Sequence, residues 1–186
     1  MTLESDVILM NEFVGKSCCF TGHRKMHQSE STVYKSLYNR LENLIFCHNV
    51  LDFYNGGAIG FDTVAALAVI NFKKMNPNKN VRLNMVLPCC KEDQTNRWAS
   101  FQIERYDYII SQADHVMYTS DKYFKGCMKK RNEALVELGH DYCLCYVDER
   151  KFKSGASQTL RMARRNGVNI VNLYEPATAI AMSIDF

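Results

Sequence analysis

Residues 50–70 read VLDFYNGGAIGFDTVAALAVI, and this stretch decides the fold class. Its first five residues are largely apolar, have the length of a buried strand and end at a glycine-rich turn, 56–62. The residues after Asp62 are apolar on nearly every side, which predicts a deeply packed helix. The stretch therefore predicts one strand–turn–helix unit of an α/β protein.

The same unit recurs along the 186-residue chain. Apolar runs alternate with helix-like segments, and neither an internal repeat nor a Pro/Gly-rich linker divides them. This order predicts one domain with a doubly wound, mainly parallel sheet of about six strands and helices on both faces. We expect Ser31 or Thr32 to cap the first helix, with Val33 and His48 on its buried face, and a polar loop through Asp93 and Gln94. The predicted strands are 17–20, 50–54, 81–87, 113–119, 142–147 and 168–173.

Three short turns rich in small residues follow the first, second and fifth predicted strands. They are Thr21-Gly22-His23-Arg24, the turn Gly56-Gly57-Ala58-Ile59-Gly60-Phe61-Asp62, and Ser154-Gly155-Ala156-Ser157-Gln158-Thr159. Right-handed crossovers bring such turns to one edge of a parallel sheet. Glycine allows a ligand to approach the backbone closely, and the free amides at a helix start attract anions. The turns therefore predict a phosphate-bearing ligand at this edge.

Individual residues of the turns fit this chemistry, although each has a simpler alternative. Thr21 offers a hydroxyl, and Arg24 offers the guanidinium geometry that matches phosphate. Asp62 either caps the following helix or receives a ribose hydroxyl. The Ser154 turn is either an ordinary capped helix or a second anion cradle, and His23 is either structural or a ligand contact.

Further candidates lie between the turns. Arg131-Asn132 starts a helix beside the same edge and either belongs to a solvated face or holds a phosphate or a base. Trp98, near Gln94, is either a core residue or a stacking surface for a base. We interpret Arg161, Arg164 and Arg165 as a solvated helix end. The acids closest to the predicted cleft are Asp62, Glu104 and Glu133, but spacing alone pairs none of them.

Composition excludes several classes of protein. A net charge of +3 is too small to indicate a dedicated nucleic-acid binder. Eight cysteines without Cys-x2-Cys spacing predict free thiols, no metal site and a reducing cytoplasmic location. Residues 1–15 lack the basic and apolar regions of a signal peptide, and no apolar run is long enough to span a bilayer. We expect a soluble protein that does not contact membranes.

Several of these motifs, in fixed order, resemble the SLOG superfamily of Rossmann-like nucleotide-binding proteins, and its YpsA-like branch in particular. The resemblance covers a domain at 17–174, with an extension at 1–16 and a tail at 175–186. The Pro-Gly-Gly-x-Gly-Thr motif of the related LONELY GUY phosphoribohydrolases is absent, since the matching region reads Ser-Gly-Ala-Ser-Gln-Thr. The chain also carries Leu135-Val136-Glu137-Leu138-Gly139 where YpsA-like proteins tend to carry Met-Val-Asp. The matching motifs are Thr21-Gly22-His23-Arg24, the 56–62 turn, Leu87-Pro88-Cys89, Asp93-Gln94 with Trp98, Arg105-Tyr106, Ala113-Asp114, the segment 123–128, Arg131-Asn132 and Ser154-Gly155.

The resemblance implies a module that binds a nucleotide or nucleotide-derived molecule, for sensing or sequestration, and needs no other cofactor. The first alternative is hydrolysis or transfer at the N-glycosidic bond of a nucleotide, with Asp62 or Glu133 as the catalytic acid. The second, related to the DNA-processing protein A family, is binding of single-stranded nucleic acid, whose affinity would fall steeply with salt. A homo-oligomer is compatible with all three. The predicted ligand-binding residues are Thr21, Gly22, His23, Arg24, Gly56, Gly57, Gly60, Asp62, Gln94, Trp98, Tyr123, Arg131, Asn132, Ser154, Gly155, Ser157 and Thr159.

Overall fold

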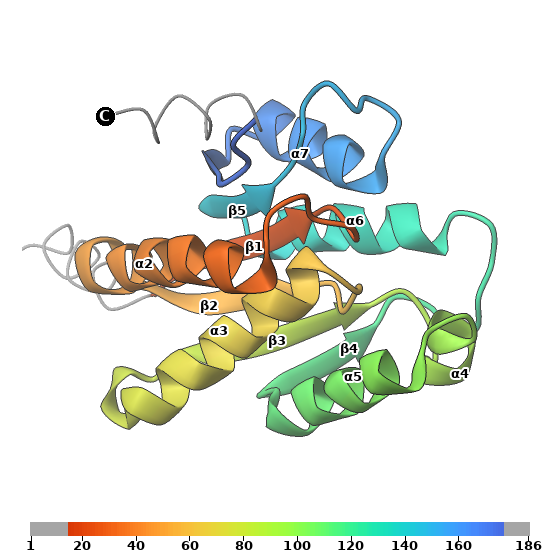
Figure 1. The fold of residues 1–186 in the computed structure, drawn as a ribbon, viewed down its shortest axis with the longest axis horizontal. Coiled ribbons are helices and arrows are strands. Elements are labelled where there is room, and N and C mark those ends of the chain that lie inside the picture. Colours follow the sequence, from red (N-terminus) through yellow and green to blue (C-terminus); the bar gives the residue numbers. More distant parts are fainter. Residues whose placement is uncertain (1–14, 177–186) are drawn as a thin grey trace, which may run out of the picture.

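One parallel sheet forms the centre of the computed structural model, which describes residues 15–176 (Figure 1). Its order is β4-β3-β2-β1-β5-β6, and every neighbouring pair is parallel. The strands are β1 (Lys16–Gly22), β2 (Val50–Asn55), β3 (Arg82–Leu87), β4 (His115–Tyr118), β5 (Tyr142–Tyr146) and β6 (Asn169–Asn172). The α-helices are α2 (Glu30–His48), α3 (Phe61–Met75), α4 (Lys91–Thr95), α5 (Ser100–Gln112), α6 (Cys127–Leu138) and α7 (Gly155–Arg165), with a 3-10 turn η1 (Pro77–Lys79).

Helices cover both faces of the sheet, which confirms the predicted Rossmann-like α/β class. One apolar cluster joins the sheet to α2, α3 and α5, which lie on the near side in Figure 1. A second cluster joins it to α6 and α7 on the other face. Strand β1 is buried from both sides, and Cys18 and Cys19 at its centre are fully inaccessible. The expected segments at 1–16 and 175–186 lie almost entirely outside the described residues.

Most predicted elements are present, and the differences are local. Ser29, rather than Ser31 or Thr32, caps α2, because its hydroxyl accepts the N–H of Thr32 at 3.2 Å. His48 lies in the last turn of α2 and is exposed, so its predicted place on the buried face was wrong. The predicted loop at Asp93 and Gln94 is the short helix α4.

The strand order places β1 at the point where the chain reverses direction across the sheet. From β1 the chain proceeds to β2, β3 and β4. It then returns through helix α6 to β5, which lies on the other side of β1. The connections leaving β1 and β5 therefore diverge, which opens a crevice beyond the carboxyl ends of these strands. The Thr21 turn and the Ser154 turn lie on opposite sides of this switch point.

Candidate functional site at the switch point of the sheet

His23 joins the three elements whose ends surround the crevice. Its N–H donates to the carbonyl of Tyr146 at the end of β5, and its carbonyl accepts the N–H of Phe61 at the start of α3. Its ring Nε2 accepts the backbone N–H of Asp148 at 2.8 Å. Burial and the charge of Lys151 lower the pKa of His23, which agrees with a neutral ring that accepts at Nε2. His23 thus holds the ends of β1 and β5 and the start of α3 together around the crevice.

The glycine-rich turn after β2 is held in place by side chains. Gly57 and Gly60 have φ of 65° and 83°, a region that suits glycine. A Cβ at Gly60 would lie 2.2 Å from the carbonyl oxygen of Arg24, so the two turns pack backbone against backbone. The amide of Gln94 in α4 donates to the carbonyl of Gly57 at 2.8 Å. The turn is therefore a preformed, rigid wall of the crevice.

Two amides of this turn are already satisfied within the protein. The N–H of Gly57 donates to Oδ1 of Asn55 at 2.8 Å, and the N–H of Ala58 donates to Oδ2 of Asp62 at 3.3 Å. Asn55 also donates to the carbonyl of Asp62. Asp62 does not cap α3, whose N-cap is Gly60, but is the second residue of the helix, in its first turn. These amides are not free for a phosphate, so the anion-binding capacity of the crevice lies elsewhere.

Asp62 and Arg131 form a buried ion pair on the wall of the crevice. Oδ2 of Asp62 lies 3.5 Å from Nη1 of Arg131, with side-chain exposures of 4% and 10%. Burial raises the pKa of Asp62 to about 6, although Arg131 and the Ala58 amide oppose this shift. Nε of Arg131 is buried and has no hydrogen-bond partner in the described part of the chain. The guanidinium is thus incompletely satisfied and can bind a further anion.

Helix α7 starts on the far side of the crevice. Ser154 caps it, since its hydroxyl accepts the N–H of Ser157 at 3.0 Å. The hydroxyl of Ser157 donates to the carbonyl of Lys151, and that of Thr159 donates to the carbonyl of Gly155. The hydroxyls of this turn therefore organise the helix start. The amides of Gly155 and Ala156 have no carbonyl partner inside the helix and can bind an anion.

Arg24 provides an exposed positive charge that lines the crevice. Its side chain is exposed, and it makes no hydrogen bond or ion pair with any residue between 15 and 176. Its charge acts on both Asp62 and Arg131, which places the guanidinium close to the buried pair. An exposed arginine without a partner in the described chain, close to a half-satisfied guanidinium, is suited to binding the same anion.

These elements enclose a pocket of about 360 Å³, which we call the switch-point pocket. A second pocket of about 370 Å³, the Trp98 pocket, adjoins it and shares Arg24 and Met128 with it. The switch-point pocket contains ten of the predicted site residues: Thr21, Gly22, His23, Arg24, Asp62, Arg131, Asn132, Ser154, Gly155 and Thr159. The Trp98 pocket contains Gln94, Trp98 and Tyr123, with Asp93, Asn96 and Arg97.

The comparison with protein families agrees with this geometry. A family model named YpsA, described as the YspA SLOG family, matches residues 18–174. The chain belongs to this family. No curated protein sequence matches it. The match covers every strand of the sheet except the first two residues of β1, so the YpsA-family domain and the observed fold have nearly the same extent.

Five predicted residues line neither pocket of this YpsA-family chain. Gly56 and Gly57 are buried behind the wall, Gly60 packs against the Arg24 backbone outside these two pockets, and Ser157 is buried in the cap of α7. Glu133 lies on the outer side of α6, where its half-exposed carboxylate pairs with Lys129 at 3.6 Å. Glu133 is therefore not placed to act on a ligand in either pocket.

The sequence alone did not reveal several residues that support the site or line its pockets. Asn55 binds the glycine turn, and Arg97 and Met128 line the pockets. Asp148 supports the far wall and accepts hydrogen bonds from Arg150 and Tyr174. Only Asn55 had a usable signal, because a polar residue at the last position of an apolar strand often binds the following turn.

Two features are absent from the described residues. Between residues 15 and 176, no group of three or more His, Cys, Asp or Glu side chains could hold a metal ion. No helix in this range combines the length and the apolar character that a membrane span requires.

Proposed function

We propose that this protein binds a nucleotide or a nucleotide-derived molecule in the switch-point and Trp98 pockets. The observation that carries the proposal is the buried Arg131 guanidinium, which has one long ion pair at 3.5 Å and an unpartnered Nε. The free first amides of α7 and the unpaired Arg24 lie around the same pocket. Together they form an incomplete anion site, and a phosphate group would complete it.

The remaining surfaces favour a nucleotide over inorganic phosphate. The Asp62 carboxylate lies in the wall of the phosphate site, where it can accept a ribose hydroxyl. The Trp98 pocket adjoins this site and presents two aromatic side chains, Trp98 and the exposed Tyr123. Aromatic rings next to a cationic site provide the stacking surface that a base requires. In this arrangement the phosphate lies in the switch-point pocket, and the base extends toward Trp98.

The proposal is tested by calorimetric titration with four nucleoside monophosphates and with the four matching nucleosides. We expect at least one monophosphate to bind, and its nucleoside to bind at least tenfold more weakly, because the phosphate makes charge-assisted contacts. Equal affinity for a nucleotide and its nucleoside would contradict a phosphate site. The absence of binding by all eight compounds would contradict a site for single nucleotides.

Catalysis at the N-glycosidic bond is a second candidate, favoured by one observation. The pKa of Asp62 is raised to about 6 in the pocket wall, which is the range of a general acid or base near neutral pH. Only Asp62 of the two predicted acids is near the ligand site. Release of free base from nucleotides, measured by chromatography and abolished in Asp62→Asn, would establish this activity. Intact nucleotides after prolonged incubation would leave binding alone.

A further inference from the structure

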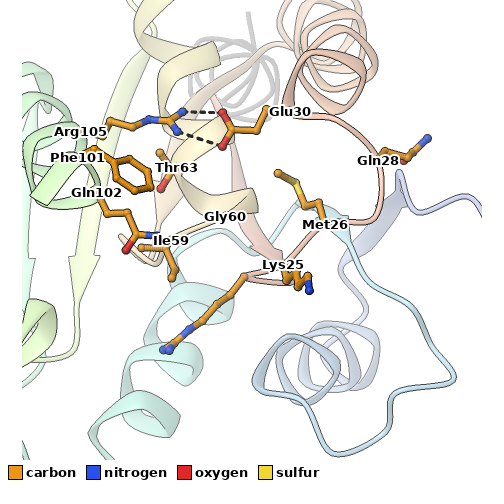
Figure 2. Close-up of a pocket in the computed structure, with 11 residues that line it drawn as sticks. Lys25, Met26, Gln28, Glu30, Ile59, Gly60, Thr63, Phe101, Gln102 and Arg105 are labelled. Carbon is orange, nitrogen blue, oxygen red and sulfur yellow. Dashed lines mark hydrogen bonds and ion pairs between the residues drawn. The ribbon is translucent and has the colours of Figure 1, made fainter. Parts of the chain in front are cut away.

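A third pocket, of about 260 Å³, adjoins the first two, and we call it the Phe101 pocket. It lies between the start of α2, the start of α3 and the first turns of α5 (Figure 2). It shares Arg24 and Ile59 with the Trp98 pocket, and Arg24 lines all three pockets. A ligand bound at Arg24 can therefore extend either into the Trp98 pocket or into the Phe101 pocket.

The walls of the Phe101 pocket are mainly neutral. Figure 2 shows Phe101, Gln102 and Ile59 on one side and Met26 and Gln28 on the other. The ring of Phe101 is 59% exposed, although it lines a concave surface. Oε1 of Gln102 accepts the N–H of Ala99, which leaves its NH2 group free to donate, and the side-chain amide of Gln28 has no partner in the described range. A flat apolar surface with free amide groups beside it suits a nucleobase.

The charges in this pocket are divided between its two ends. Arg105 forms a bidentate ion pair with Glu30 at 3.0 Å for both contacts, so its charge is already compensated (Figure 2). The hydroxyl of Thr63 donates to the carbonyl of Ala58. The uncompensated cations are Arg24 and Lys25, which make no ion pair with another described residue. An anionic group therefore belongs at the Arg24 end, and a neutral group belongs between Phe101 and Met26.

The size of the three pockets favours one ligand that extends over more than one of them. Small-molecule sites usually measure about 300–1,000 Å³. The Phe101 pocket is below this range, and each of the other two is near its lower end. Because the three meet at one unpaired arginine, they form a site with a central cationic point and two arms. One arm ends at Trp98 and the other at Phe101.

We propose that the Phe101 pocket binds the second nucleoside of a dinucleotide, that is, two nucleosides joined through a pyrophosphate. This inference rests on the proposed nucleotide site and assigns its ligand class. The pyrophosphate lies between Arg24 and Arg131, the first base lies against Trp98, and the second base stacks on Phe101. Phe101 and the Gln102 amide then select dinucleotides over mononucleotides.

Calorimetry with matched ligands and variants tests this assignment. The ligands are the four nucleoside monophosphates and the four symmetrical dinucleoside diphosphates, titrated into the wild type, Phe101→Ala and Tyr108→Ala. Tyr108 is a suitable control because it is a partly exposed aromatic residue on the same helix, 41% accessible, and lies outside the pocket. We expect the wild type to bind a dinucleoside diphosphate at least fivefold more tightly than the corresponding monophosphate, since stacking on one aromatic ring provides about this factor.

The outcomes separate the two proposals. We expect Phe101→Ala to lose this fivefold preference while its affinity for the monophosphate stays unchanged, and Tyr108→Ala to behave as the wild type. Equal affinities of the wild type for the two ligand classes would overturn the dinucleotide assignment and leave nucleotide binding intact. An equal loss of affinity for monophosphates and dinucleoside diphosphates in Phe101→Ala would also overturn the dinucleotide assignment and leave nucleotide binding intact. If neither class binds the wild type, the nucleotide site itself is refuted, and the Phe101 assignment with it.

Discussion

At the scale of single residues, the candidate site depends on a charged pair that is buried in the wall of the switch-point pocket. Burying Asp62 and Arg131 costs hydration free energy, and one contact at 3.5 Å returns only part of it. A fold that needed only stability would not retain Arg131 with an unpartnered Nε. The pair therefore fits a binding role better than a structural one.

Gly56 leaves the space in which the Arg131 guanidinium lies. A Cβ added at Gly56 would come within 1.5 Å of Nη1 of Arg131. We expect Gly56→Ala to displace this guanidinium from Asp62 and to lower the free energy of unfolding by about 1–3 kcal/mol. Urea denaturation measures this change. Gly155→Ala is the control, because its added Cβ meets no described atom within 4 Å, and this variant should lose no stability.

The raised pKa of Asp62 predicts a specific dependence of stability on pH. With a pKa of about 6 in the folded state against an ordinary 3.8, the folded protein binds more protons than the unfolded chain between these values. The stability contribution of Asp62 is present below pH 4 and is lost as the pH rises through 6. Relative to Asp62→Asn, the wild type should lose up to about 3 kcal/mol between pH 4 and 7.

Asp52 provides the control of opposite sign for this measurement. Burial alone would raise the pKa of Asp52, but hydrogen bonds from Arg82 and Asn84 lower it overall. Relative to Asp52→Asn, the wild type should therefore lose stability as the pH falls below 4. Urea denaturation across the pH range measures both differences. A flat difference for Asp62→Asn would contradict the assigned pKa.

At the scale of elements, the hydroxyls and the backbone amides at the start of α7 have different roles. The hydroxyls of Ser154, Ser157 and Thr159 organise the helix, and its first amides remain available to a ligand. The sequence left open whether this turn is an ordinary capped helix or an anion cradle. Only the geometry separates the two roles, because Ser and Thr favour helix starts with or without a ligand.

The cap of α7 gives a prediction that involves no ligand. Ser154→Ala removes the acceptor for the Ser157 N–H and should lower the free energy of unfolding by about 1 kcal/mol. Ser154→Gly should lower the free energy of unfolding by only a few tenths of about 1 kcal/mol, since glycine is tolerated at the cap position. Thermal or urea denaturation compares the two variants. Equal losses in both would indicate that the hydroxyl has another structural role.

The sequence predicted elements better than it predicted the contacts between them. The strand–turn–helix pattern identified all six strands, because each apolar run is bounded by turn residues. It placed ten predicted residues in one pocket, since parallel strands end at one edge. It could not show that Asn55 and Asp62 occupy the amides of the glycine turn, or that Glu133 faces outward. Those features depend on side-chain directions that spacing does not determine.

At the scale of the whole molecule, the order β4-β3-β2-β1-β5-β6 creates the site. The reversal at β1 separates the turns after β1 and β5, and α6 crosses over to bring Arg131 between them. Arg24 then lies at the junction of three pockets without an ion-pair partner in the described chain. The fold thus places an arginine without an ion-pair partner in the described chain where three pockets meet, and this is the point at which we propose that a ligand phosphate binds.

The most direct test is the calorimetric affinity of Arg24→Ala for the best-binding nucleotide. Arg165→Ala is the matched control, because Arg165 is an exposed arginine at the end of α7 and lines none of the described pockets. We expect Arg24→Ala to bind at least tenfold more weakly than the wild type, as the loss of a charge-assisted contact requires, with Arg165→Ala unchanged. Unchanged affinity in Arg24→Ala would contradict a phosphate site at the switch point of the sheet.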